Sequence, residues 1–219
     1  MALLGAAGVG LVAACADTPT SPTMTGSTTG GGTTNAACAV TPTETVGPYP
    51  SLTDLIRSDI REGKSGTALT LAMTVVNTNN NCAPLESVQV EIWQCDATGN
   101  YSQYGSQAAQ TFLRGIQTTN SDGGVTFTTI YPGWYQGRAT HIHVEVSRNG
   151  SSLKVTQIAF PESTNATVYA TGVYAARGSN PTSNARDNIF ADSIDSELAA
   201  VSGDPVSGVT ASFRIGIAA

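Results

Sequence analysis

The amino-acid sequence predicts an all-β protein, namely a β-sandwich with long loops and few short helices. Charged residues make up only 12% of the chain, and Val and Thr recur in short runs, which favours strands over amphipathic helices. From residue 67 onward, apolar or alternating runs are separated by turn sequences such as DGG and RNGSS. Short strands at this spacing are typical of a β-sandwich.

Each predicted strand is one of these runs, bounded by turn residues. The runs are TALTLAMTVVN (67–77), ESVQVEIWQC (86–95), GVTFTTIY (124–131), HIHVEVS (141–147), LKVTQIAF (153–160) and VTASFRIGI (209–217). We predict short helices at 52–60 and 189–198, and no long core helix, because no strong 3.6-residue periodicity is present.

Length and charge narrow the classes of function. A chain of 219 residues fits one domain, with or without an unstructured arm, better than two domains. The formal net charge of −6 leaves no basic stripe that could neutralise phosphates. We therefore expect no nucleic-acid partner.

The first residues have the pattern of an export signal. Residues 2–14 form an apolar run too short to cross a bilayer as a helix, and VAAC (12–15) resembles the lipobox of bacterial lipoproteins. Residues 16–36 carry little apolar surface to bury, which predicts a flexible tether. The predicted organisation is a signal peptide at 1–14, a lipidated Cys15 and Thr/Gly/Ser tether at 15–37, and a β-sandwich domain at 38–219.

This organisation predicts an exported protein, held at the extracellular face or in the cell envelope of a bacterium. The expected membrane contact is the lipid on Cys15 alone. In an exported protein, two of the remaining cysteines are expected to pair. Cys82 and Cys95 bracket a predicted strand and so lie too far apart to bridge, which leaves Cys38 as the shared partner of one or the other.

The two histidines of the chain lie within three residues, at His141 and His143. They belong to an alternating run, so both imidazoles are expected on one face of a strand, with Cα atoms roughly 6.6 Å apart. Two imidazoles at that separation can bind one metal ion. The alternative is a polar strand face with two hydrogen-bonded histidines.

Tyrosines in turns near this pair supply candidate phenolate ligands. Residues 131–138 form a Gly/Pro-rich turn directly before the histidines, and Tyr101 follows the turn at 96–100. Composition alone does not choose among Tyr101, Tyr104, Tyr131 and Tyr135. Imidazole combined with anionic oxygen suits a ferric ion, and a bound cation favours the ionised phenol.

Five segments together resemble one known family. They are TPTETVGPYP (41–50), DIREG (59–63), VEIWQCDATGNYS (90–102), FLRGIQTTNSDGGVTFTTIYPGWYQGRATHIHVEV (112–146) and TQIAFPE (156–162). In this order they are similar to the intradiol ring-cleavage dioxygenases, the family of catechol, hydroxyquinol and protocatechuate dioxygenases. The short interval between PGWY and HIH resembles the exported, single-chain lipoprotein branch.

The resemblance implies a non-haem Fe(III) enzyme that inserts both atoms of O2 into a catechol-type substrate to give a cis,cis-muconate-type product. It implies the iron ligands Tyr101, Tyr135, His141 and His143. It assigns Tyr135, Arg138 and Gln157 to catalysis, and Thr45, Gly47, Pro48, Tyr49 and Arg138 to substrate binding. Whether segment 45–49 acts within its own chain or across a homodimer stays open, as does the preferred catechol.

Two further classes of function remain as alternatives. One is a catalytically inactive, exported β-sandwich that binds aromatic or glycan ligands through Trp93 and Trp134. The other is a ferric-catecholate carrier, which would need iron affinity without oxygen chemistry. Oxygen consumption with catechol distinguishes the enzyme from both.

Overall fold

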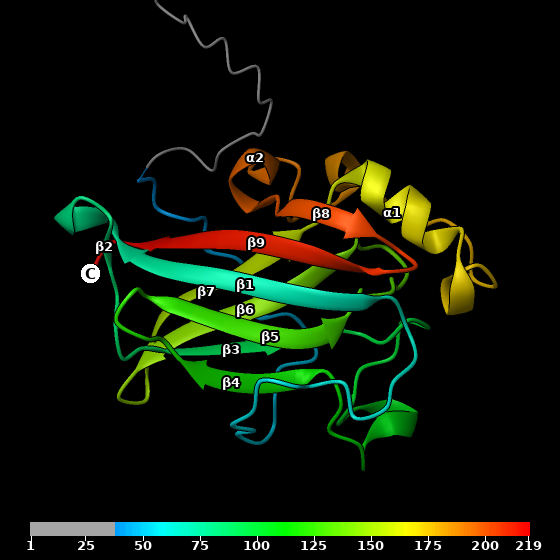
Figure 1. The fold of residues 1–219 in the computed structure, drawn as a ribbon, viewed down its shortest axis with the longest axis horizontal. Helices are drawn as coiled ribbons and strands as arrows, with labels where there is room; N and C mark the ends of the chain where they lie inside the picture. The colour runs from blue at the N-terminus through cyan, green and yellow to red at the C-terminus, as the bar shows by residue number, and fades with distance from the viewer. Residues whose placement is uncertain (1–37) are drawn as a thin grey trace, which may run out of the picture. The chain divides into compact units, whose positions relative to one another are not determined.

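Two β-sheets packed face to face form most of the computed structural model, which describes residues 38–219 (Figure 1). The first sheet has the order β2-β1-β9-β8, with β5 also paired to β1; the second has the order β4-β3-β6-β7. All pairings are antiparallel except that of β1 with β9. The predicted β-sandwich is confirmed.

The elements follow the chain as short strands with long connections. The strands are β1 (Ala68–Asn77), β2 (Ala83–Pro84), β3 (Gln89–Trp93), β4 (Arg114–Thr118), β5 (Gly124–Ile130), β6 (His141–Arg148), β7 (Ser151–Ala159), β8 (Ala200–Asp204) and β9 (Gly208–Ile217). The helices are α1 (Glu162–Tyr169) and α2 (Ile194–Glu197), with 3-10 turns η1 (Thr78–Asn80), η2 (Gly105–Gln107), η3 (Gly172–Tyr174) and η4 (Asn184–Arg186).

The core lies between the inner faces of the two sheets. In β1 every second side chain is buried, and the same alternation in β9 places apolar residues on the inner face. The contributing residues include Leu69, Leu71, Met73 and Val75 of β1, and Ile142, Val144 and Val146 of β6. Burial of such side chains contributes roughly 1.5–3 kcal/mol each, so this face fixes the register of every strand.

The outer face of the second sheet carries a row of side chains that crosses all four strands. The strand register pairs Trp93 with Arg114 on one side and with His143 on the other, and pairs His143 with Gln157. Residues opposite one another in paired strands point to the same face. From β4 to β7 the row therefore reads Arg114, Trp93, His143 and Gln157.

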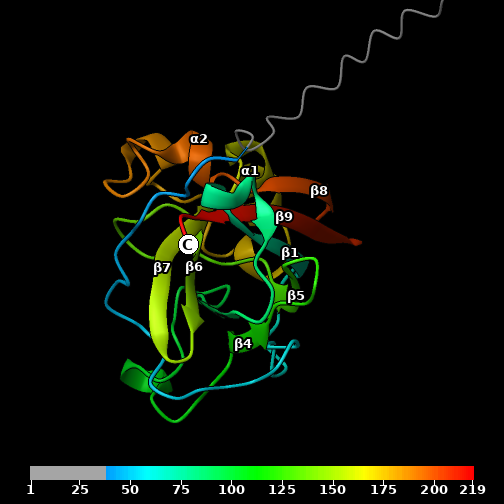
Figure 2. The ribbon, with the colours of Figure 1, turned by 90° about the vertical axis from the view of Figure 1, so that its left-hand side faces the viewer.

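The first described residues and the segment around Phe190 lie beside this sheet. Figure 2 shows the β6–β7 hairpin on one side of the molecule and β1, β5 and β9 on the other, with the start of the described chain alongside β7. The buried amine of Lys154 donates to the Thr41 carbonyl and the Thr43 hydroxyl, at 2.8 and 2.7 Å, which fixes that segment. Phe190, in the segment before α2, packs with Ala139 and Ala159.

The prediction of a helix at 52–60 is wrong. Its backbone instead bonds to neighbouring strands: Arg57 N donates to Ile116 O, and Ile60 N donates to Thr128 O. A helix would withdraw these groups into its own ladder and leave the edge of β4 uncovered. At 189–198 the helix α2 covers part of the predicted range, and the short α1 follows β7 where no helix was predicted.

A disulfide joins Cys38 to Cys82, which resolves the alternatives left by the sequence. Cys95 is free and buried, and burial raises the pKa of its thiol to about 12. The predicted signal peptide, Cys15 and tether lie outside the described residues. Within 38–219, no helix is long and apolar enough to cross a membrane.

Glu197 provides a test of the packing around α2. It is fully buried, and burial together with the nearby Glu44 and Asp192 charges raises its pKa to about 7, against one hydrogen bond from Ser193. The unfolded chain releases this proton near pH 4.5, so the free energy of unfolding should fall as pH rises from 4.5 to 7.

Glu197→Gln should remove this decline, because a neutral amide has no proton to release. The variant should gain stability relative to wild type by on the order of 1–3 kcal/mol between pH 4.5 and 7, with a constant difference above pH 7.5. Urea unfolding at a series of pH values measures the difference. A pH-independent difference would show that Glu197 ionises normally in the folded protein.

Candidate metal centre

Four predicted side chains converge at the start of β6. The Nε2 atoms of His141 and His143 lie 3.1 Å apart, and the Tyr135 hydroxyl lies 3.4 Å from His141 Nε2. The ring of Tyr101 lies 5.8 Å from that of Tyr135 and 6.2 Å from that of His143, between centroids. The segments that carry Tyr101 and Tyr135 thus bring their phenol rings to the two histidines of β6.

Neighbouring groups hold the two imidazoles in place. His141 Nδ1 lies 2.6 Å from the Ala139 carbonyl oxygen, to which it can donate, and this leaves Nε2 unprotonated and able to accept. The ring of His143 is stacked on Trp93, with 5.0 Å between centroids and an interplanar angle of 1°. Both Nε2 atoms are therefore directed by fixed contacts to the same place.

The turn before Tyr101 is built on Asp96. The Asp96 carboxylate accepts hydrogen bonds from the backbone amides of Thr98 and Asn100, at 2.9 and 3.0 Å. Gly99 has a φ of +87°, which favours glycine, and a Cβ there would lie 2.4 Å from the Trp134 carbonyl oxygen. This close approach brings the Tyr101 turn against the Tyr135 turn.

Tyr104 and Tyr131, the other tyrosines that composition left open, are engaged elsewhere. The Tyr104 hydroxyl donates to the Pro50 carbonyl at 2.8 Å, and the Tyr131 hydroxyl donates to Asn165 at 2.7 Å. The Tyr101 hydroxyl, by contrast, is buried and finds no hydrogen-bond partner in the part of the chain that the structure describes.

The protonation states suit metal binding. Burial, followed by the charge of Arg138, lowers the pKa of His141 to about 3. Burial likewise moves the pKa of His143 well below its usual range, so both imidazoles are neutral, as metal ligation requires. Burial raises the pKa of Tyr101 well above its usual value, and a bound cation would reverse that effect.

These residues fit a metal ion on geometric grounds as well. Two nitrogen atoms that each lie about 2.1 Å from one ion, at a right angle, are about 3.0 Å apart. The observed separation of the two Nε2 atoms is 3.1 Å. A cation ligated by Tyr101 would offset the desolvation cost of its buried hydroxyl, which is about 1–3 kcal/mol.

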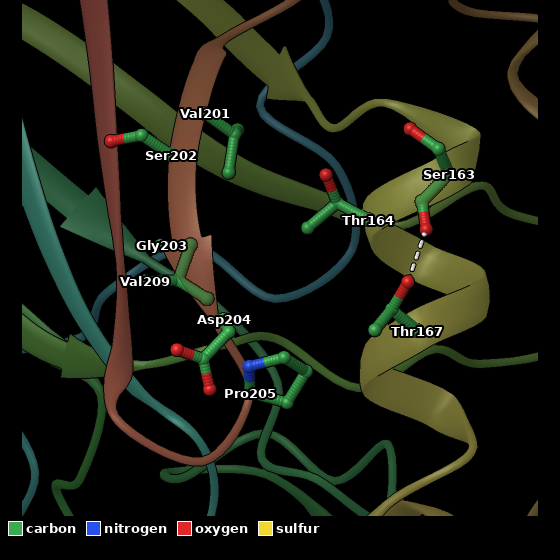
Figure 3. A pocket seen from close by; sticks show the side chains of 9 residues that line it. All are labelled: Ser163, Thr164, Thr167, Val201, Ser202, Gly203, Asp204, Pro205 and Val209. Atoms are coloured by element: carbon green, nitrogen blue, oxygen red, sulfur yellow. Dashed lines mark hydrogen bonds between the residues drawn. The ribbon is translucent and has the colours of Figure 1, made fainter.

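No group of three or more His, Cys, Asp and Glu side chains able to hold a metal occurs within 38–219. A cavity of about 200 Å³ between α1 and β8 is lined by hydroxyl, apolar and backbone groups and by Asp204 (Figure 3). The Asp204 carboxylate accepts from the backbone amides of Val206 and Ser207 in its own turn. None of the predicted site residues lines this cavity.

Arg138 and Gln157 lie beside the histidines as a hydrogen-bonded pair. Arg138 Nη2 donates to Gln157 Oε1 at 2.5 Å, and Gln157 Nε2 donates to the Thr45 carbonyl at 2.9 Å. Arg138 Nε also forms an ion pair with Asp187 at 2.8 Å. The predicted arginine and glutamine thus connect the candidate centre to segment 45–49.

Segment 45–51 accepts hydrogen bonds from the two residues at the ends of the cross-strand row, Gln157 and Arg114. Gln157 binds it at Thr45, and Arg114 donates to the Tyr49 carbonyl at 3.0 Å. Between these ties, Gly47 lies so close to His143 that a Cβ would be 2.9 Å from His143 Cε1. The segment therefore lies over the candidate centre of its own chain, and its Tyr49 ring is stacked on the Tyr101 ring at 4.6 Å between centroids.

Three residues of the site were missed from the sequence. Trp93 was considered only as a binding platform, yet it packs on His143. Arg114 is fully buried and also donates to the Ser102 carbonyl at 2.7 Å. Asp187 lies far along the chain from the motifs, and its role depends on a contact 49 residues away.

The fold and this centre define an all-β protein with a buried Tyr/His site. Residues 46–180 match the family model described as Dioxygenase. The solved intradiol ring-cleavage dioxygenase from Tetranychus urticae is 31% identical, with a TM-score of 0.74, covering 82% of this chain and 95% of that chain. The chain belongs to the intradiol ring-cleavage dioxygenase family.

Two other relatives are matched over very different shares of their length. The dioxygenase domain of a dioxygenase and carbohydrate-binding protein fusion from Streptomyces sp. SirexAA-E is 30% identical, with a TM-score of 0.62, covering 81% of this chain and 97% of that chain. Catechol 1,2-dioxygenase of Candida albicans is 34% identical over 115 residues, and the match covers 42% of this chain and 38% of that relative. This chain thus spans well under half the length of that relative.

Gly47 tests the cover over His143. Gly47→Ala should displace the segment or the His143 ring, because the new methyl group would lie 2.9 Å from the ring. Gly63→Ala is the matched control: Gly63 has the same φ of +73°, but nothing lies within 4 Å of its Cβ position. Both variants should lose about 1–2 kcal/mol from backbone strain.

Bound metal after purification separates the two variants. Gly63→Ala should keep the wild-type content, and Gly47→Ala should retain less than about half of it, since ligand position controls affinity. Equal metal contents would mean that Gly47 does not constrain His143.

Proposed function

We propose that this protein is a non-haem iron(III) intradiol dioxygenase that inserts both atoms of O2 into a catechol-type substrate. The observation that carries the proposal is the convergence of the Tyr101 and Tyr135 side chains on two neutral imidazoles whose Nε2 atoms are 3.1 Å apart. A mixed set of hard phenolate oxygen and imidazole nitrogen suits a ferric ion. Membership of the family supports the same reaction class.

The proposed product is a cis,cis-muconate-type dicarboxylate. The ring bond between the two hydroxyl-bearing carbons is cleaved, and each of these carbons gains one oxygen atom. Because both atoms of O2 end in the product, the reaction needs no external reductant.

Tyr101, Tyr135, His141 and His143 would hold the iron. When bound, the ferric ion would supply Lewis acidity that favours the ionised catechol and draws electron density from its ring. Tyr101 is buried behind Tyr49 and packed between two turns, which suits it to remain in place through a reaction cycle. Tyr135 is less buried and lies on the Gly/Pro-rich turn, which suits it to move.

Tyr135 is proposed to take up a proton from the substrate. A catechol that binds through both oxygens must lose two protons, and Tyr135, whose Oη lies 3.4 Å from His141 Nε2, would take up one of them. Burial raises the pKa of Tyr135, more than the Arg138 charge lowers it, so the protonated phenol is the stable form once it is free. General-base catalysis of this kind contributes about 10²–10⁴-fold.

Arg138 is proposed to stabilise negative charge on the substrate. Its guanidinium is already oriented by Asp187 and Gln157, so little reorganisation is needed when charge develops. The segment that contains Gly47, Pro48 and Tyr49 would exclude water from the bound ring, since it is held over the site by Gln157 and Arg114.

Substitution of the two tyrosines tests this assignment. Tyr135→Phe should retain iron through the other three ligands but lose about 10²-fold or more in catechol turnover, because its proton acceptor is gone. Tyr101→Phe should lose iron, because it removes a ligand proposed to stay bound. Tyr131→Phe is the control and should keep both properties, since its hydroxyl bonds to Asn165 outside the site.

Iron content, visible absorption and oxygen uptake with catechol are measured on the same preparations, with product analysis. Wild-type protein should carry iron, absorb visible light through tyrosinate-to-iron charge transfer, and consume one O2 per muconate formed. A Tyr135→Phe protein with wild-type turnover removes that residue from the mechanism. Iron binding without oxygen uptake for any catechol favours a carrier or a binding module instead.

We also propose that the protein is exported and anchored through a lipid on Cys15. The Cys38–Cys82 disulfide supports export, since stable disulfides are rare in a reducing cytosol. The bond joins cysteines 44 positions apart and ties the start of the described chain to the start of β2.

Replacement of Cys15 by Ser should move the protein from the membrane fraction to the soluble fraction, because the lipid would have no attachment atom. The folded domain should keep wild-type catechol turnover. Fractionation followed by the same oxygen assay measures both. A variant that stays in the membrane fraction after mild washing contradicts the lipid anchor.

A further inference from the structure

A single buried carboxylate, that of Asp187, connects to two parts of the candidate centre. Asp187 is fully buried at the end of η4. One of its oxygens, Oδ2, accepts both the Arg138 Nε–H at 2.8 Å and the Ala139 backbone N–H at 2.6 Å. The other, Oδ1, accepts the Ile189 backbone N–H at 2.8 Å.

The first connection runs through Arg138 to the proposed substrate space. With Nε held by Asp187, the Arg138 Nη2 is directed at Gln157, which in turn holds the Thr45 carbonyl. The Arg138 carbonyl is fixed separately by Asn180 Nδ2 at 2.9 Å. The guanidinium therefore has a single orientation that depends on the Asp187 carboxylate.

The second connection runs through Ala139 to His141. Asp187 fixes the backbone N–H of Ala139, and the carbonyl of the same residue binds His141 Nδ1 at 2.6 Å. Phe190, three residues after Asp187, packs edge-on against the His141 ring at 6.3 Å between centroids. The same short segment thus orients the imidazole from two sides.

We propose that Asp187 is a positioning residue that sets both the Arg138 guanidinium and the His141 imidazole through one carboxylate. The inference rests on the proposed function for its kinetic consequences. Asp187 lies beyond residues 46–180, the part of the chain that the family model matches, so it adds to the site from a segment outside that match. The link through Arg138 predicts an effect on kcat, and the link through Ala139 to His141 predicts an effect on iron affinity. These two effects distinguish a positioning role from general destabilisation.

Asp187→Asn keeps the size of the side chain but removes the charge that orients Arg138, and it replaces one acceptor oxygen with a donor. The variant should bind iron about 10-fold more weakly through the Ala139–His141 link, and its kcat per bound iron should fall about 10- to 100-fold through the Arg138 link. Glu62→Gln is the control, because Glu62 is also an ion-paired carboxylate but lies outside the site, beside Arg57 and Thr111. It should leave both properties unchanged.

A double-mutant cycle with Arg138→Gln separates the two links. In the Arg138→Gln background, Asp187→Asn should have almost no further effect on kcat per bound iron, while it should still weaken iron binding about 10-fold. A purely structural role would lower both quantities by the same factor in both backgrounds. That result would overturn the proposal.

A measurement on the iron-free protein is independent of enzyme activity. The Arg138 Nε–H should exchange slowly with solvent in wild type and fast in Asp187→Asn, as followed by NMR. If Asp187→Asn does not fold, the wild-type signal alone decides, since fast exchange there contradicts a fixed guanidinium. If wild type consumes no oxygen with any catechol but this exchange pattern and the iron-affinity loss are seen, the proposed function fails and the positioning role stands.

Discussion

The burial of two neutral imidazoles side by side at the start of β6 is the constraint on which the rest of the site depends. Removing two polar rings from water is costly unless their nitrogen atoms find partners, and the Nε2 atoms of His141 and His143 face each other. Each ring is therefore fixed by its surroundings, His141 by the Ala139 carbonyl and His143 by the Trp93 ring. A cation bound by both Nε2 atoms would offset this desolvation cost.

The β-sandwich makes this arrangement possible because the two faces of its second sheet have different roles. The inner face of β6 packs Ile142 and Val144 into the core and so fixes the register of the strand. That register places His143 between Trp93 and Gln157 on the outer face. The segments that cover this face are then held by side chains of the same row, so the core ultimately determines the position of the cover.

The sequence carried enough information for the parts of the site that depend on local periodicity. The alternation around His141 and His143 predicted a shared strand face, and the turn before Tyr101 predicted a tyrosine at a strand end. Features set by contacts between distant segments were not predictable. Segment 52–60 is extended because it bonds to β4 and β5, Cys38 pairs with Cys82 through the packing at the end of β1, and Asp187 reaches Arg138 only in the folded chain.

Two tyrosines and two histidines are proposed to bind one iron ion. Diffraction from crystals of the iron-loaded protein, recorded on both sides of the iron absorption edge, tests this proposal most directly. We expect one anomalous peak within bonding distance of four atoms, namely Tyr101 Oη, Tyr135 Oη, His141 Nε2 and His143 Nε2. A peak elsewhere, or a peak bonded to the histidines with both tyrosine oxygens out of reach, would contradict the account.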